Sequence, residues 1–128
     1  MQQILDKEVK VVLAELEKSL KAVGDVVELG CYMGDTSLLM GKMLKQKKSE
    51  KQLWLYDSFE GLPEKTAQDS SSLGENFKLG ELKATKAEVM RKFMKSGLLR
   101  PIVKKAWFDD LNAATDLPKK ISFALLDG

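Results

Sequence analysis

The stretch Asp25-Val-Val-Glu-Leu-Gly-Cys-Tyr-Met-Gly-Asp-Thr-Ser37 sets the architecture of this chain. Its residues Val26 to Leu29 are apolar enough for a short buried strand, and two glycines follow within a turn. A helix is predicted to begin at Asp35 or Thr36. A strand, a glycine loop and a helix in this order are typical of α/β proteins, which bind nucleotide-like ligands there because the backbone can approach the ligand closely.

The residues inside this loop narrow the choice of ligand. A dinucleotide fingerprint starting at Gly30 requires glycines at 32 and 35, where the chain has Tyr32 and Asp35. A phosphate would also meet the carboxylates of Glu28 and Asp35, although anions favour helix N-termini without competing negative charge. S-adenosylmethionine suits the loop better, because it carries a sulfonium and an α-ammonium. The plainer alternative is a strand, a turn and a helix capped by Asp35 or Thr36.

Composition excludes several other classes of protein. A chain of 128 residues with 44% hydrophobic and 31% charged residues suits one globular domain. The absence of histidine excludes catalytic triads and His-ligated zinc. The one cysteine, Cys31, excludes an internal disulfide and favours the cytoplasm. A net charge of +2 does not indicate nucleic-acid binding, and no apolar run approaches the roughly 20 residues of a membrane span.

Hydrophobic periodicity predicts alternating helices and strands. Apolar residues three and four apart predict helices over 2–23, 36–46 and 85–97. Short apolar runs predict strands over 26–29, 52–57, 101–106 and 121–126. Gly24 is expected to end the leading helix in a left-handed cap, 64–84 to be a flexible binding loop, and 111–114 a short helical turn. This order predicts an α/β, Rossmann-like doubly wound parallel sheet with helices on both faces.

The second predicted strand ends in Asp57, which lies 27 positions after Gly30. An acid at this place in an α/β fold accepts hydrogen bonds from ribose hydroxyls. It is a second, separate indication of an adenosine-containing ligand. The alternative is that Asp57 only caps the turn that follows it.

Four stretches are informative together: Val26-Val-Glu-Leu-Gly-x-x-x-Gly34, Leu55-Tyr-Asp-Ser-Phe-Glu-Gly-Leu-Pro63, Ala106-Trp-Phe-Asp109 and Ala124-Leu-Leu-Asp-Gly128. They resemble class I S-adenosylmethionine-dependent methyltransferases, and more narrowly the macrocin O-methyltransferase (TylF) family, which includes sugar O-methyltransferases of antibiotic biosynthesis. The second stretch is the most specific. The chain departs mildly from the family pattern where Ala106 replaces a common glycine and Asp110-Leu-Asn replaces Thr-Leu-Pro.

The resemblance implies a set of cofactor-binding residues. By position they are Glu28, Gly30, Tyr32, Gly34, Thr36, Asp57, Ser58, Phe59, Trp107, Phe108 and Asp127. The glycine-loop residues would line the methionine part of the cofactor, Asp57 would hold the ribose, and the aromatic pair at 107 and 108 would lie near the adenine. Asp127 matches the first acid of a family Asp-Gly-Asp motif, which implies a divalent metal, usually magnesium, in the full-length enzyme.

The chain ends at Gly128, before the second acid of that motif and before further family strands. A family sheet ordered 3-2-1-4-5-7-6 would here contain only 3-2-1-4, so the apolar strand 121–126 would be an exposed edge. We therefore expect residues 1–128 to be the cofactor-binding part of a truncated methyltransferase domain that is inactive alone, with the catalytic residues beyond residue 128. Coverage of this edge by a second copy of the chain is the other expectation.

The resemblance implies methyl transfer from S-adenosylmethionine to a hydroxyl of a sugar or small molecule, with metal assistance. Neither a nucleic acid nor a membrane is an expected partner. Two alternatives stay open. One is a nucleoside-binding module without chemistry, and the other is an NAD-type oxidoreductase, which the loop mismatch disfavours.

Overall fold

The computed structural model describes residues 6–31, 34–59 and 85–126. Within them, four parallel strands form one sheet in the order β3-β2-β1-β4. The strands are β1 (Asp25–Leu29), β2 (Leu53–Asp57), β3 (Ile102–Lys105) and β4 (Ile121–Leu126). This order confirms the predicted incomplete doubly wound sheet. Because all pairs are parallel, the carboxyl ends of the strands share one edge, which we call the carboxyl edge.

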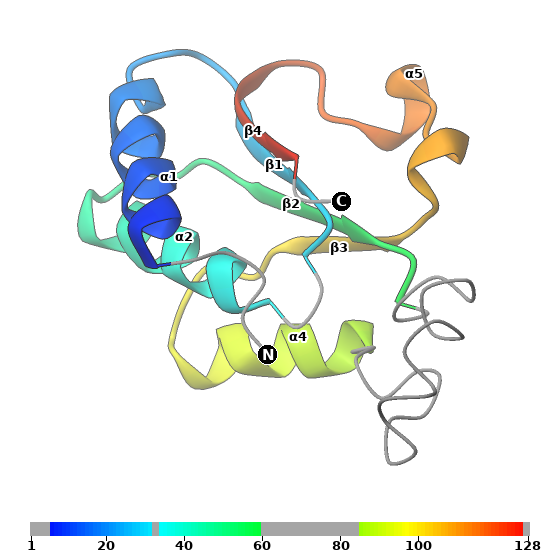
Figure 1. The fold of residues 1–128 in the computed structure, drawn as a ribbon, viewed down its shortest axis with the longest axis horizontal. Coiled ribbons are helices and arrows are strands. Elements are labelled where there is room, and N and C mark those ends of the chain that lie inside the picture. The colour runs from blue at the N-terminus through cyan, green and yellow to red at the C-terminus, as the bar shows by residue number, and fades with distance from the viewer. Residues whose placement is uncertain (1–5, 32–33, 60–84, 127–128) are drawn as a thin grey trace.

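Three helices cover one face of the sheet (Figure 1). They are α1 (Asp6–Ser19), α2 (Asp35–Gln46) and α4 (Lys86–Lys95), with α1 packed on α2 and α2 on α4. The other face carries the β3–β4 connection, which contains the 3₁₀ turn η1 (Phe108–Asp110) and the short helix α5 (Ala113–Asp116). On that face the Tyr56 hydroxyl donates a 2.5 Å hydrogen bond to the carbonyl oxygen of Asp116.

Successive side chains of β2 point to opposite faces of the sheet. Leu53 and Leu55 point toward the helices and belong to the core, whereas Trp54 and Tyr56 point to the opposite face. The helical side of this core is completed by buried residues of α1, α2 and α4, namely Leu16, Met40, Leu44, Val89 and Phe93. The helices are therefore held by apolar burial on one face of the sheet.

Local signals predicted the bounds of α4 correctly. The Thr85 hydroxyl accepts a 3.1 Å hydrogen bond from the backbone N–H of Glu88, as a capping box requires. Gly97, with φ +66°, follows the last turn in a left-handed conformation. Both ends of this helix are thus encoded within a few residues of the sequence.

Two predicted caps are wrong. Helix α1 ends at Ser19, five residues before Gly24, so Gly24 does not cap it. Gly24 instead permits a close backbone approach, since a Cβ there would lie 2.8 Å from the backbone of Lys120 and Ser122. The N-cap of α2 is Gly34, with φ +84° and no side-chain cap, so neither Asp35 nor Thr36 caps that helix.

Strand β4 forms one edge of the sheet that the structure describes. Ile121 and Leu126 are exposed there, Leu126 by 72%. Among the described residues, no helix combines the length and apolar character that a membrane crossing needs. The predicted binding loop over 64–84 lies outside the described residues.

Candidate cofactor site

The glycine loop leaves the sheet between the ends of β1 and β2. The backbone N–H groups of Gly30 and Cys31 both donate to the carbonyl oxygen of Tyr56, at 2.8 and 3.3 Å. Gly30 has φ +96°, a conformation that glycine adopts without strain. The Gly34 N–H then donates to Cys31 at 2.7 Å, and α2 begins directly afterwards. The start of the loop is therefore bonded to the end of β2, and Gly34 at its other end is bonded back to Cys31.

Glu28 connects this loop to the helix that follows. Its side chain is 1% exposed, and the Ser37 hydroxyl in the first turn of α2 donates a hydrogen bond to its Oε1. Thr36 is buried beside it in the same turn. The carboxylate of Glu28 thus lies beneath the loop and anchors α2 to β1. Direct lining of the methionine part by Glu28 stays a prediction.

Asp57 is held rigidly at the end of β2. The residue is 6% exposed, and its Oδ1 accepts a 2.9 Å hydrogen bond from the backbone N–H of Phe59. Phe59 has φ +58°, which is uncommon for a bulky residue, and its ring is buried in the core. The turn-capping alternative for Asp57 is therefore confirmed. Ribose binding is compatible with it, because an ionised carboxylate has two oxygens and about four acceptor positions.

A cavity of about 420 Å³ lies beside this turn and the end of β3. Ser58 lines one side and Trp107 another, so residues predicted for the ribose and the adenine border the same space. Trp107 is 54% exposed, and Phe108 is the next residue in η1. An exposed aromatic ring beside a cavity suits stacking against a flat ligand.

The Cys31 thiol lies near the two acidic side chains of the carboxyl edge. Burial raises the pKa of the Cys31 thiol, and the negative charges of Glu28 and Asp57 raise it further. The buried edge therefore has a negative potential that disfavours another anion. This potential fits the sulfonium and α-ammonium of S-adenosylmethionine and opposes a pyrophosphate.

Comparison with known proteins identifies the family. The model of the family described as "Macrocin-O-methyltransferase (TylF)" matches residues 5–128. The chain belongs to the TylF family. The family uses S-adenosylmethionine, in agreement with the ligand inferred from the loop.

Two similar proteins are longer than this chain. The chain is 34% identical over 94 residues to an 8-demethyl-8-(2,3-dimethoxy-alpha-L-rhamnosyl)-tetracenomycin-C 4'-O-methyltransferase from Streptomyces olivaceus, covering 68% of this chain and 36% of the relative. It also matches the structure of the O-methyltransferase NovP with a TM-score of 0.73 and 24% identity, covering 95% of this chain and 53% of NovP. The likeness to NovP shows the fold. The chain thus spans about a third and about half of the lengths of these proteins.

Most of the residues predicted for the TylF cofactor site gather at the carboxyl edge. Those that the structure places in or just after the ends of β1, β2 and β3 are Glu28, Gly30, Gly34, Thr36, Asp57, Ser58, Phe59, Trp107 and Phe108. Tyr32 and Asp127 lie outside the described residues. No group of three potential metal ligands occurs within the part of the chain that the structure describes.

Sequence reasoning missed three features of this edge. It did not single out Ser37, whose hydroxyl contacts Glu28, nor Lys104 and Asp116, which line the cavity beside Ser58. A hydroxyl in the first turn after a glycine loop could have indicated the first of these. No local pattern marks the other two, because Lys104 in β3 and Asp116 at the end of α5 come together beside Ser58 only in the fold.

Proposed function

We propose that this chain forms the S-adenosylmethionine-binding part of an O-methyltransferase that modifies a hydroxyl of a sugar or another small molecule. The observation that carries the proposal is the pair of buried acidic residues Glu28 and Asp57 at the carboxyl edge, beside the glycine loop, which suits a cationic cofactor. The family supports methyl transfer to oxygen. The sugar acceptor is supported by the Streptomyces relative, whose name specifies a 4'-O-methyltransferase of a rhamnosyl compound.

Each part of the site has a distinct role in this proposal. The cofactor would supply a methyl group on its sulfonium, and enzymes of this kind act mainly by positioning the two reactants. Asp57 would accept hydrogen bonds from the ribose hydroxyls, and Trp107 would cover the adenine beside the 420 Å³ cavity. Gly30 allows the backbone to pass close to the ligand, while the contact between Ser37 and Glu28 keeps α2 in place.

Metal assistance belongs to the same proposal. A hydroxyl acceptor must lose its proton, and a divalent metal or a carboxylate would promote this loss. Asp127 would be one ligand, and magnesium sites in proteins use further oxygen ligands and waters. We therefore assign the remaining ligands and the acceptor pocket to other parts of a longer, cytoplasmic enzyme, in which a second copy or later strands cover the β4 edge. The lengths of the relatives support this division.

Titration calorimetry tests the proposal with the 128-residue chain and two ligands. S-adenosylhomocysteine is expected to bind, and NAD is expected not to bind, because its pyrophosphate would meet the negative edge. Binding of NAD without binding of S-adenosylhomocysteine would falsify the proposal. A methyl-transfer assay with a sugar acceptor on the full product of the gene distinguishes an enzyme from a module that only binds nucleosides.

A further inference from the structure

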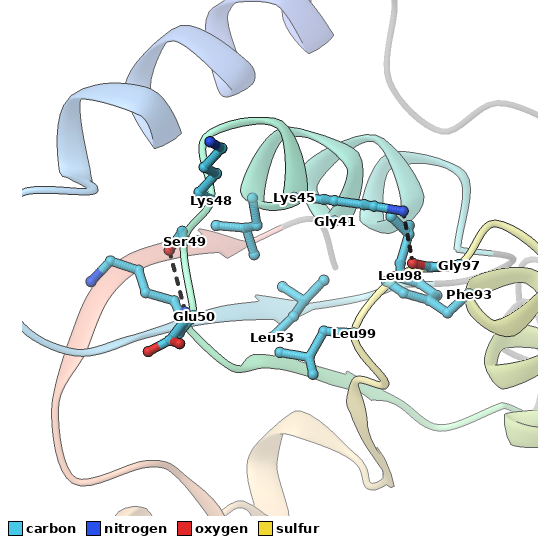
Figure 2. A pocket seen from close by; sticks show the side chains of 12 residues that line it. Gly41, Lys45, Lys48, Ser49, Glu50, Leu53, Phe93, Gly97, Leu98 and Leu99 are labelled. Atoms are coloured by element: carbon cyan, nitrogen blue, oxygen red, sulfur yellow. Dashed lines mark hydrogen bonds between the residues drawn. The ribbon is translucent and has the colours of Figure 1, made fainter.

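Helix α4 packs along α2, the helix that begins at the end of the glycine loop (Figure 1). Phe93 and Leu98 lie against Gly41 of α2, where a Cβ would be 2.8 Å from the Phe93 ring. Farther from the loop, the Lys45 ammonium donates a 3.1 Å hydrogen bond to the carbonyl oxygen of Gly97 (Figure 2). The position of α4 relative to α2 is therefore fixed by close packing.

The first turn of α4 also contacts the glycine loop itself. A Cβ on Gly34, the N-cap of α2, would lie 3.3 Å from Cγ1 of Val89, which is fully buried. Gly34 is the residue whose N–H is bonded back to Cys31 in the loop. A shift of α4 would therefore be transmitted to the loop.

One turn farther along α4, Lys92 pairs with Asp35, the first residue of α2. The Lys92 ammonium lies 3.4 Å from Oδ1 of Asp35, and the two side chains are 35% and 52% exposed. Ion pairs with this exposure contribute little to stability. The pair does, however, place two charges beside the loop, because Asp35 directly follows Gly34 and consecutive Cα atoms are about 3.8 Å apart.

Charge at this place matters because the cofactor and its product differ in charge. S-adenosylmethionine carries one net positive charge, the sum of its sulfonium, α-ammonium and carboxylate. Its product, S-adenosylhomocysteine, has an uncharged thioether in place of the sulfonium and is neutral overall. The buried acids Glu28 and Asp57 at the carboxyl edge favour the cationic form. Asp35 adds a further carboxylate beside the loop, and the charge of Lys92 offsets it.

We propose that Asp35 and Lys92 set how strongly the site prefers S-adenosylmethionine over S-adenosylhomocysteine. Lys92 is a positioning residue, because it acts through Asp35 by holding that carboxylate toward α4 and offsetting its charge. The pair thereby governs how strongly the enzyme is inhibited by its own product. This inference rests on the proposed function, since it requires a cofactor site at the glycine loop.

Titration calorimetry with both ligands, on the 128-residue chain in about 0.1 M salt, tests this inference. The measured quantity is the Kd of S-adenosylhomocysteine divided by the Kd of S-adenosylmethionine. Lys92→Met keeps the apolar stem and removes the charge that offsets Asp35, so this ratio is expected to rise by about two- to fivefold, the effect of one charge at about 10 Å. Asp35→Asn is expected to lower the ratio by a similar factor. The double variant lacks both charges and is expected to return close to the wild-type ratio, and Lys92→Arg is expected to keep it.

A packing role and a charge role of Lys92 give different results. A variant that only loosens α4 weakens the binding of both ligands equally and leaves the ratio unchanged. A charge effect also depends on salt, because the screening length falls from about 10 Å at 0.1 M to about 3 Å at 1 M. The rise of the ratio in Lys92→Met is therefore expected to disappear in 1 M salt.

Lys18→Met is the matched control, because it breaks another exposed ion pair, in which the Lys18 ammonium lies 3.7 Å from Glu15 near the end of α1. That end of α1 leads into the start of β1, at the edge of the sheet opposite the loop, so the ratio is expected to stay at the wild-type value. An unchanged ratio in Lys92→Met, a rise that persists in 1 M salt, or an equal rise in Lys18→Met would overturn this inference and leave the proposed function standing. Failure of the wild-type chain to bind either ligand would overturn both.

Discussion

Replacement of Asp57 separates its role in the turn from its role in binding. Asp57→Ala removes the acceptor that holds the buried Phe59 N–H at 2.9 Å. An unsatisfied buried donor costs about 1–3 kcal/mol, so this variant is expected to lose that much free energy of unfolding. Asp57→Asn keeps an oxygen in the same place and is expected to lose less than about 1 kcal/mol. Urea denaturation of the two variants measures the role in the turn.

Binding of S-adenosylhomocysteine measures the other role. Charge-assisted hydrogen bonds to ribose hydroxyls are worth about 1–3 kcal/mol, or about a five- to 150-fold change in Kd. Both variants are expected to lose this binding free energy. In Asp57→Asn the one carbonyl oxygen of the side chain accepts from the Phe59 N–H, and the amide group that faces the ribose is a donor. Glu15→Gln removes a carboxylate on α1, away from the site, and should bind as the wild type does. Wild-type affinity in Asp57→Asn would show that Asp57 acts only as a turn cap.

Three further predictions concern stability, measured by urea denaturation. Gly24→Ala is expected to lower the free energy of unfolding by about 2 kcal/mol or more, because the new Cβ would lie 2.8 Å from backbone atoms of Lys120. Gly97→Ala should lower it by about 1 kcal/mol, because its Cβ meets only the end of a lysine side chain at 3.4 Å. Equal effects of the two variants would contradict the close approach at Gly24. Ser37→Ala is expected to cost about 1–3 kcal/mol by removing a donor to the buried Glu28, and an unchanged stability would show that this contact does not anchor α2. Burial, with Asp116 as a smaller cause, raises the pKa of Tyr56 from 10.0 to about 12. The unfolded chain therefore loses the Tyr56 proton at a lower pH than the folded chain does. The contribution of this protonated side chain to stability should be lost as pH rises from 10.0 to about 12. Tyr56→Phe should lack that part of the pH dependence, and an identical pH profile in the variant would refute the assignment.

Local signals in the sequence were sufficient to predict the helices and strands. The strands were predicted within a residue or so of their observed bounds, because buried parallel strands are short apolar runs. The capping box at Thr85 and the glycine at 97 indicated where α4 begins and ends, because the groups that end a helix lie within one turn of it. Gly24 was misassigned because the backbone that it approaches, around Lys120, is remote in the sequence.

The amino-acid sequence therefore determined the family and the position of Asp57 from residues that are close together along the chain, and the strand order followed from the family resemblance. Tertiary structure was needed to place Ser37 against Glu28, to hold Phe59 in its left-handed turn, and to bring 44–53 and 93–99 together around a cavity of about 500 Å³. These contacts depend on side chains that meet across packed elements, and no periodicity or spacing encodes such meetings.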